Sequence, residues 1–375
     1  MKVLITGANG FVGKNLQLYL AERSDVQVVC FTRSDDLAQL SVMIQGVDFV
    51  FHLAGVNRPL DPSEFVSGNT DLTQALCKEV RTVAETTGKK VSVVYTSSTQ
   101  AAYENAYGRS KRSAEDALLE LQRSHDVLVH VFRLPNLFGK WCKPNYNSAV
   151  ATFCYNIARS LPIQVNDPEA PVTLVYVDDL VERFVQLMDG ANAAVDAVGF
   201  TTIFPQYTTT VGGLVRQFQD FKDSRATLMT EGVCTGLMRA LYATYISYLP
   251  VESFAYTVPQ HADPRGVFVE MLKTPDCGQF SYFTAHPGVI WGGHYHHSKT
   301  EKFLVIKGQA RFRFRHMQSG QTHELITTGD KSQIIETVPG WRHDITNTGP
   351  EEMVVMLWAN EVFDRYRPDT FDCPL

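Results

Sequence analysis

Hydrophobic and polar residues follow two different patterns along this chain. Up to about residue 190, short apolar runs alternate with longer stretches in which apolar residues recur every three or four positions. Strands are expected at residues 3–5, 26–31, 49–52, 91–95 and 129–132, and helices at 14–22, 69–87 and 107–123. This alternation predicts βαβ units, and hence a Rossmann-type α/β domain with a doubly wound parallel sheet.

The pattern changes after about residue 245. Short runs with strand character, such as 267–272, 303–306, 311–315 and 353–357, are separated by Gly, Pro, Asp and Asn. Closely spaced strands without helices between them predict an antiparallel sandwich or barrel. A helical stretch over 233–248 ends before Pro250 and is expected to connect the two parts. We therefore predict two domains, 1–245 and 246–375.

Composition and charge narrow the possible partners. The formal net charge of -6 gives no overall positive potential, so nucleic acid is not an expected partner. No apolar run approaches the length of a membrane-spanning helix. The seven cysteines show no CxxC spacing, which is typical of reduced thiols. We expect a cytoplasmic protein that does not associate with membranes.

A glycine-rich loop lies between the first expected strand and the first expected helix. It consists of Gly7, Ala8, Asn9, Gly10, Phe11, Val12 and Gly13. Such glycines let the backbone turn tightly and approach a pyrophosphate at a helix N-terminus, which predicts a dinucleotide site rather than an ordinary turn. Arg33, at the end of the second strand, suits the 2′-phosphate of NADPH. Asp35 and Asp36 nearby leave NADH as the alternative.

A second pattern places a phenol and an amine on one face of a helix. Tyr107 and Lys111 are four residues apart. Lys111 in that position can lower the pKa of the phenol and hold the nicotinamide ribose, so that Tyr107 donates a proton to a carbonyl that accepts hydride. The preceding strand closes in the hydroxyl residues Ser97, Ser98 and Thr99, which would lie beside the same carbonyl.

Over residues 1–245 these motifs resemble the extended short-chain dehydrogenase/reductase superfamily. Further matching segments are residues 52–55, 133–139 and 177–179. The resemblance implies a catalytic set of Ser98, Tyr107 and Lys111, with Thr99 as the alternative hydroxyl. It also implies that Leu53, Ala54 and Gly55 contact the cofactor and that Asn136 faces the substrate. We interpret the Asp178-Asp179 pair as a helix N-cap.

The same resemblance has one informative departure. Sugar-nucleotide dehydratases of the superfamily carry an Asp-Glu pair just after the catalytic hydroxyl, whereas Thr99, Gln100 and Ala101 stand at this place. Without this acid/base pair for elimination, simple reduction of a keto sugar is the favoured reaction.

The second part of the chain carries histidines at a regular spacing. His294, His296 and Glu301 match the first cupin motif, and His343 lies in a close match to the second. Alternate residues of a strand face one side, so His294 and His296 are both expected to point inward and His297 outward. The four would form a three-His, one-carboxylate site for a divalent metal, with zinc as first candidate and Fe, Mn and Ni as alternatives. Metal-free core histidines or general bases are the other possibility.

A third segment, around Asp263 and Arg265, resembles the Asp-x-Arg-Gly-x-Phe sequence of dTDP-keto-sugar epimerases. This resemblance suggests that Arg265 binds the substrate diphosphate or polarises its carbonyl. A turn into a strand is an equal alternative.

A reductase followed by a cupin resembles the CapF/WbjC family of capsule and O-antigen synthesis over essentially the whole chain. The resemblance implies the substrate UDP-2-acetamido-2,6-dideoxy-β-L-arabino-hexos-4-ulose, epimerised at C3 by the cupin and reduced at C4 with NADPH to UDP-N-acetyl-6-deoxy-L-talosamine. A C4 ketone acidifies the C3 proton, so epimerisation must precede reduction. A base from the histidine cluster with Tyr295 or Tyr282 could move that proton.

Two alternatives remain open at this point. The chain could be an NADPH-dependent reductase whose cupin is only a metal-stabilised dimerisation module, or a nucleotide-sugar sensor that performs no chemistry. Because cupins often pair their sheets, a homodimer is expected.

Overall fold

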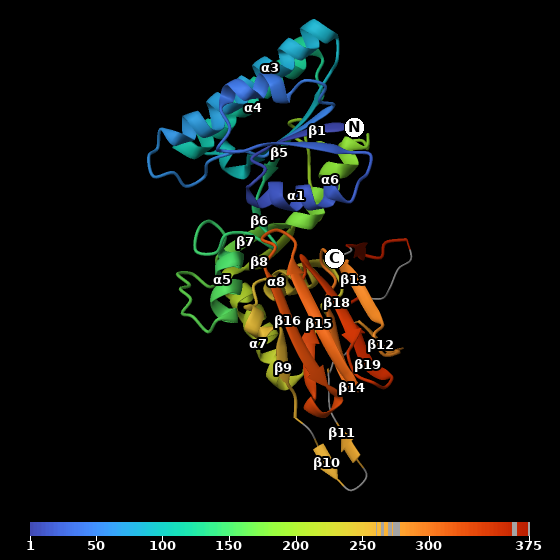
Figure 1. Cartoon of the computed structure of the whole chain (residues 1–375). Helices are drawn as coiled ribbons and strands as arrows, with labels where there is room; N and C mark the ends of the chain where they lie inside the picture. The colour runs from blue at the N-terminus through green and yellow to red at the C-terminus, as the bar shows by residue number, and fades with distance from the viewer. Residues whose placement is uncertain (260, 264–265, 269–271, 273–277, 362–365, 374–375) are drawn as a thin grey trace. The chain divides into compact units, whose positions relative to one another are not determined.

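The computed structural model describes residues 1–259, 261–263, 266–268, 272, 278–361 and 366–373 (Figure 1). The chain forms two compact units. The first consists of Met1–Leu137 and Thr173–Thr208, and the second of Phe138–Val172 and Thr209–Leu375. Among the described residues, no helix is both long and apolar enough to span a bilayer.

A parallel five-stranded sheet forms the centre of the first unit, in the order β2-β1-β3-β4-β5. The strands are β1 Lys2–Thr6, β2 Gln27–Phe31, β3 Phe49–His52, β4 Ser92–Ser98 and β5 Val129–Leu134. All four residues of β3 are buried, as expected for a strand covered on both faces. From β1 the chain proceeds to β2 on one side and later to β3 on the other. The switch point, where α/β sheets bind ligands, therefore lies between β1 and β3.

Helices cover both faces of this sheet, and the predicted α/β fold is confirmed. They are α1 Phe11–Ala21, α2 Leu40–Met43, α3 Leu72–Thr87, α4 Ala106–His125 and α6 Val177–Met188. Figure 1 shows α3 and α4 on one face and α1 and α6 on the other. On the second face, the ring of Phe184 in α6 lies 5.8 Å from that of Phe51 and 5.3 Å from that of Phe132.

The start of α6 corrects one expectation. The helix begins at Val177 and its N-cap is Tyr176, so the prediction that Asp178 and Asp179 form the cap is wrong. Both carboxylates instead lie in the first turn, where the positive end of the helix dipole favours them.

Two sets of short elements complete the connections. Single turns of 3-10 or π-helix occur at Leu37–Gln39, Val66–Asp71, Thr99–Ala102, Val251–Ser253 and Gly329–Lys331. The strands β6 Asn136–Phe138, β7 Pro171–Tyr176 and β8 Tyr207–Thr210 form a sheet in the order β6-β7-β8. This small sheet contains residues at which the chain passes from one unit to the other.

Two antiparallel sheets form most of the second unit, which confirms the predicted antiparallel domain. One has the order β12-β19-β14-β17-β9 and the other β16-β15-β18-β13-β20. The strands are β9 Ala255–Thr257, β12 Gln279–Ala285, β13 Ile290–Tyr295, β14 Glu301–Lys307, β15 Gln309–His316, β16 Thr322–Thr328, β17 Gln333–Glu336, β18 Trp341–Asn347, β19 Met353–Ala359 and β20 Phe371–Asp372, with a separate pair, β10 His261–Asp263 and β11 Gly266–Phe268. Phe303 and Phe312 meet between the sheets at a ring distance of 5.7 Å.

The helices of the second unit are α5 Ala149–Ala158, α7 Val211–Thr227 and α8 Gly236–Ser247, and they pack against one another. A buried ionic cluster joins α7 to the antiparallel strands. Glu336 of β17 lies 3.0 Å from Arg225 of α7 and also pairs with Lys302 of β14. Lys302 further donates to the hydroxyl of Tyr256 at 3.0 Å. Because Glu336 is only 2% exposed, this carboxylate depends on both cations.

Candidate functional site

The glycine-rich loop lies at the switch point between β1 and β3. Gly7 has φ +69°, and a Cβ there would stand 2.6 Å from the main-chain nitrogen of Ala54, in the segment that follows β3. A Cβ on Gly13 would stand 2.5 Å from the carbonyl oxygen of Gly7. The predicted loop thus packs directly against the predicted 53–55 segment, and only glycine permits both approaches.

The start of α1 has the properties of a phosphate site. Gly10 is its N-cap and offers no side chain to the first N–H groups of the helix, those of Phe11, Val12 and Gly13. Asn9 and Gly10 are exposed. Unfilled N–H groups at the positive end of a helix bind an anion, so the loop fits the pyrophosphate of a dinucleotide.

The residues that follow β2 bear on the choice of cofactor. The carboxylate of Asp35 accepts the N–H of Thr32 at 2.7 Å and its hydroxyl at 2.8 Å. Asp36 caps the next turn by accepting the N–H of Ala38 at 2.9 Å. Both acidic groups are therefore engaged in local turns, while Arg33 is exposed at the strand end.

Ser98, Tyr107 and Lys111 come from the end of β4 and the first turns of α4. The side chains of Tyr107 and Ser98 are hydrogen-bonded. Lys111 donates from Nζ to the main-chain oxygen of Thr96 at 2.9 Å. A Cβ on Gly55 would lie 3.0 Å from this Nζ, so the amine stands beside the segment that follows β3. The structure thus brings together the three predicted catalytic residues and the predicted cofactor segments.

Burial changes the pKa values of Tyr107 and Lys111. It raises the pKa of Tyr107, and the hydrogen bond with Ser98 opposes the rise only in part. The expectation that this phenol has a lowered pKa therefore does not hold in this structure, because desolvation is the larger effect. Burial also lowers the pKa of Lys111 to about 8. The phenol consequently stays protonated, as a proton donor requires.

One buried residue near this group was not expected from the sequence. Asn69 accepts the N–H of Val56 at 2.8 Å and donates to its carbonyl at 3.0 Å and to the hydroxyl of Ser110 at 2.9 Å. It thereby fixes the segment after β3 to α4. Nothing in the local pattern distinguishes this Asn from a surface residue of a helix.

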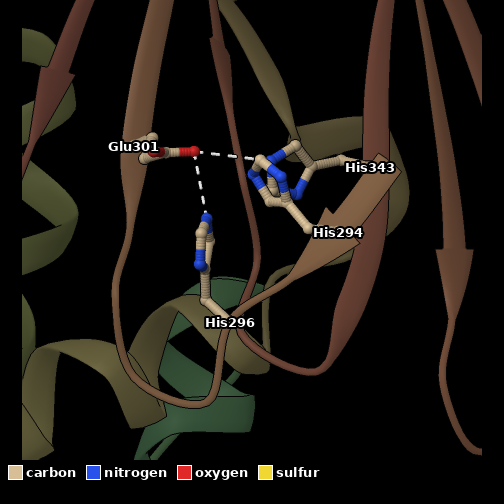
Figure 2. A group of neighbouring side chains, drawn as sticks. All are labelled: His294, His296, Glu301 and His343. Atoms are coloured by element: carbon tan, nitrogen blue, oxygen red, sulfur yellow. Dashed lines mark hydrogen bonds and ion pairs between the residues drawn. The ribbon is translucent and has the colours of Figure 1, made fainter. Parts of the chain in front are cut away.

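Figure 2 shows the side chains of His294, His296, Glu301 and His343 directed toward one another. Their ligand atoms all lie within 4.8 Å of one another. The Oε2 atom of Glu301 is 3.1 Å from Nε2 of His296 and 3.4 Å from Nε2 of His343. The predicted four-residue set therefore converges, with His294 in β13, His296 just after it, Glu301 in β14 and His343 in β18.

A β-bulge in β13 brings His294 toward His343. Gly292 and Gly293 both have positive φ, at +87° and +86°, and the register with β18 shifts between Gly292 and His294. A Cβ on Gly292 would lie 3.0 Å from the carbonyl oxygen of His343. The extra residue allows His294 to stand opposite His343 on the inner side of the sheet.

The polar atoms of the cluster fit a divalent cation. Both ring nitrogens of His343 are buried, and within the described part of the chain their nearest charged neighbour is the carboxylate of Glu301, 3.4 Å from Nε2, with no well-formed hydrogen bond to either nitrogen. His296 faces an acceptor on each side, the carbonyl of Asp369 at 2.6 Å and Glu301 at 3.1 Å. Burial lowers the pKa of His294 to about 3, so this imidazole is neutral and can act as a ligand. Burial opposes ionisation of Glu301, but His296 and His343 hold its pKa well below its usual value.

The comparisons with known proteins agree with this geometry. Residues 3–197 match the NAD dependent epimerase/dehydratase family, and residues 261–371 match the polysaccharide biosynthesis C-terminal domain. The chain is 58% identical over 373 residues to the UDP-2-acetamido-2,6-beta-L-arabino-hexul-4-ose reductase of Pseudomonas aeruginosa, covering 100% of this chain and 98% of that protein. The crystal structure of the capsular polysaccharide assembling protein CapF from Staphylococcus aureus is 38% identical, with a TM-score of 0.66 and 100% of both chains covered.

The chain belongs to the CapF/WbjC family. Its predicted resemblance to that family is thereby confirmed, as is the order of an epimerase-type α/β domain and an antiparallel domain. UDP-glucuronic acid 4-epimerase from Bacillus cereus is 17% identical with a TM-score of 0.55, covering 66% of this chain and 98% of that one, and shares the fold. Membership of the NAD-dependent epimerase/dehydratase family implies a NAD(P) cofactor for this CapF/WbjC relative.

The two tyrosines considered as acid/base partners lie apart from the histidine cluster. The ring of Tyr295 packs against those of His297 and Phe371, at 5.6 Å each. Tyr282 is 71% exposed and precedes Phe283, whose ring contacts the interior Phe303 at 6.3 Å. By strand alternation Tyr282 therefore faces outward.

Of the remaining predicted residues, the structure describes Asn136 and His297 but not Arg265. Asn136 is exposed in β6, and its amide donates to the carbonyl of Thr173 at 3.2 Å. Arg265 lies outside the described residues. His297, expected to point away from the cluster, packs against Phe371 at 4.9 Å and is not among the four grouped side chains.

Proposed function

We propose that the chain is a bifunctional nucleotide-sugar enzyme. Its substrate is UDP-2-acetamido-2,6-dideoxy-β-L-arabino-hexos-4-ulose, which it epimerises at C3 and then reduces at C4 to UDP-N-acetyl-6-deoxy-L-talosamine. The observation that carries the reductase half is the grouping of Ser98, Tyr107 and Lys111 beside the glycine loop, in a chain collinear with a reductase of a UDP-linked keto sugar. We place the reductase domain at 1–245 and the cupin domain at 246–375.

In the reduction, NADPH supplies the hydride to C4. Tyr107 donates its proton to the C4 oxygen, and Ser98 hydrogen-bonds the same oxygen. Lys111, held against Thr96, supports the charge that develops on the phenolate and binds the nicotinamide ribose. Asn136 contacts the substrate of this reaction, whereas Arg265 is assigned to binding the substrate in the cupin. The raised pKa of Tyr107 keeps the phenol protonated until the carbonyl takes up hydride.

The cofactor would be held along the carboxyl ends of β1, β2 and β3. The residues assigned to it are Gly7, Asn9, Gly10, Phe11, Val12, Gly13, Arg33, Leu53, Ala54 and Gly55, together with Tyr107 and Lys111. Arg33 favours NADPH over NADH because Asp35 is already engaged by Thr32 and cannot serve the ribose 2′-hydroxyl in this conformation.

Epimerisation is assigned to the cupin. His294, His296, Glu301 and His343 would hold one divalent metal, with zinc as first candidate, and such an ion would supply Lewis-acid chemistry to this site. The ketone at C4 acidifies the C3 proton, and reduction removes that ketone. Epimerisation therefore comes first, and hydride transfer traps the product.

A second candidate is a reductase without epimerase activity, whose metal-stabilised cupin only joins two copies into a homodimer. The name of the Pseudomonas aeruginosa relative, which mentions reduction alone, favours it. Analysis of the product formed in deuterated water separates the two candidates, because only epimerisation places deuterium at C3. NADPH absorbance with the UDP-linked keto sugar tests the reductase itself.

A further inference from the structure

The last described residues of the chain pass directly beside the histidine cluster. The main-chain carbonyl of Asp369 accepts a hydrogen bond from Nδ1 of His296 at 2.6 Å, across 73 residues of sequence. Strand β20 then pairs with β13, so that Phe371 lies opposite Tyr295 and Asp372 opposite His294. A distant segment is thus fixed against the strand that leads into the cluster.

The carboxylate of Asp369 is anchored by three successive N–H groups. It accepts those of His297 and Ser298 at 2.9 Å each and that of Lys299 at 2.7 Å. The hydroxyl of Ser298 adds a fourth hydrogen bond at 3.1 Å. Successive backbone N–H groups that converge on an anion form a nest, and bonds to an ionised acceptor are stronger than neutral ones. Asp369 is therefore locked onto the turn that follows His296.

Asp369 also adopts an uncommon backbone conformation. Its φ of +37° lies in the left-handed region, which costs free energy for any residue with a Cβ and persists only where contacts enforce it. The nest is one such contact. Lys299 provides another, because its Nζ donates to the carbonyl of Pro368 at 3.1 Å and to the hydroxyl of Thr370 at 2.6 Å. This conformation serves two contacts at once, the carbonyl with His296 and the carboxylate with the nest.

We infer that Asp369 is a positioning residue that sets the tautomer and orientation of His296 for metal binding. A carbonyl oxygen only accepts, so Nδ1 of His296 must carry the proton. Nε2 is then the nitrogen that faces the cluster: in the metal-free protein it donates to Oε2 of Glu301 at 3.1 Å, and a bound metal would take the place of that proton. Such outer contacts orient a ligating imidazole and raise its basicity. The inference rests on the metal site of the proposed function and deepens it.

The first test uses the full-length, metal-free wild-type protein with 15N-labelled histidine at mildly alkaline pH. NMR should show His296 with a proton on Nδ1, the nitrogen that faces the carbonyl of Asp369. A His296 without a proton on Nδ1 overturns the inference. This measurement needs no variant and no bound metal. It therefore tests the contact between His296 and the carbonyl of Asp369 even if the protein binds no metal.

The second test compares zinc affinities by competition with a chromogenic chelator. Asp369→Ala should weaken zinc binding roughly 10- to 100-fold. Asp369→Asn should recover most of this loss, because it keeps an acceptor oxygen and tolerates left-handed backbone. Asp372→Ala removes an exposed carboxylate from the same segment and should leave the affinity unchanged.

These results separate the inference from the proposal on which it rests. Wild-type affinity in a folded Asp369→Ala protein, or equal losses in Asp369→Ala and Asp372→Ala, overturns the role of Asp369. Absence of zinc binding by the wild-type protein instead contradicts the metal site, and the NMR measurement then decides on Asp369.

Discussion

Lys111 donates a hydrogen bond of 2.9 Å from its Nζ to the main-chain oxygen of Thr96. Thr96 lies in β4, two residues before Ser98, so this contact ties the amine to the strand that carries the serine. The lysine is buried, and the burial lowers its pKa to about 8. The protein thus holds a charged group inside the domain, at a cost in stability, where the proposed reaction needs it.

Replacement of Lys111 by methionine should stabilise the protein and abolish reduction. The pKa of Lys111 is about 8 in the folded state against 10.5 for the unperturbed side chain, so the folded state binds fewer protons between these values. The free energy of unfolding therefore rises with pH across this window. Below pH 8, Lys111→Met should raise it by on the order of 1–3 kcal/mol. Denaturant unfolding at two pH values checks this, and a variant with the wild-type pH slope would contradict the account.

Tyr107→Phe should lower the rate of C4 reduction by about 100-fold or more, because the proton donor is lost. The affinity for NADPH should stay close to that of the wild type, and exchange of the C3 proton with solvent should continue. The matched control is Tyr103→Phe, at an exposed tyrosine between β4 and α4, which should keep wild-type turnover. Loss of both activities in Tyr107→Phe would argue against two separate sites.

Replacement of His294 and His296 together by glutamine should remove the metal and the C3 exchange. The reductase should still consume NADPH when it is given the 3-epimerised keto sugar, because its residues lie in the other unit. Metal content by plasma mass spectrometry and exchange by NMR are the two readouts. His286→Gln, at an exposed histidine, should change neither. Retained C3 exchange in the double variant would exclude the cluster from epimerisation.

Glu336→Gln should destabilise the second unit by about 3–5 kcal/mol, because it leaves Lys302 and Arg225 buried without their carboxylate. Attraction from these two cations outweighs burial and lowers the pKa of Glu336, so its stabilising contribution is lost as the pH falls through the acid range. Glu351→Gln removes an exposed pair with Lys307 at 3.8 Å and should cost less than about 1 kcal/mol. Equal effects of the two substitutions on thermal unfolding would contradict this role.

The sequence allowed the local features of the fold to be predicted. The strand periodicity predicted β1 to β5 to within a few residues, and the runs 303–306, 311–315 and 353–357 lie within β14, β15 and β19, because each depends on neighbouring positions. Residues 269–271 of the predicted run 267–272 lie outside the described residues. The four clustered residues were predictable from their spacing, which resembles the two cupin motifs, but the bulge at Gly292 and Gly293 that brings His294 opposite His343 was not. The error at Asp178 also has a local cause, because an Asp in the first turn of a helix and an Asp at the N-cap have the same sequence signature.

Contacts between distant segments could not be predicted in this way. Asp369 meets His296 across 73 residues, and Glu336 meets Arg225 from another layer of the second unit. Asn69, which lies between β3 and α3, donates a hydrogen bond to Ser110 of α4. Each is a polar residue whose surroundings, and not its neighbours in sequence, make it buried. Only the tertiary structure distinguishes these residues from the many similar ones on the surface.

The most direct test of the bifunctional account follows NADPH absorbance with the freshly prepared UDP-linked 4-keto sugar in deuterated water and then determines the product by NMR. The account predicts NADPH oxidation together with deuterium at C3 and inverted configuration at that carbon. Oxidation with C3 unlabelled and unchanged would contradict it and leave a reductase whose second domain has only a structural role.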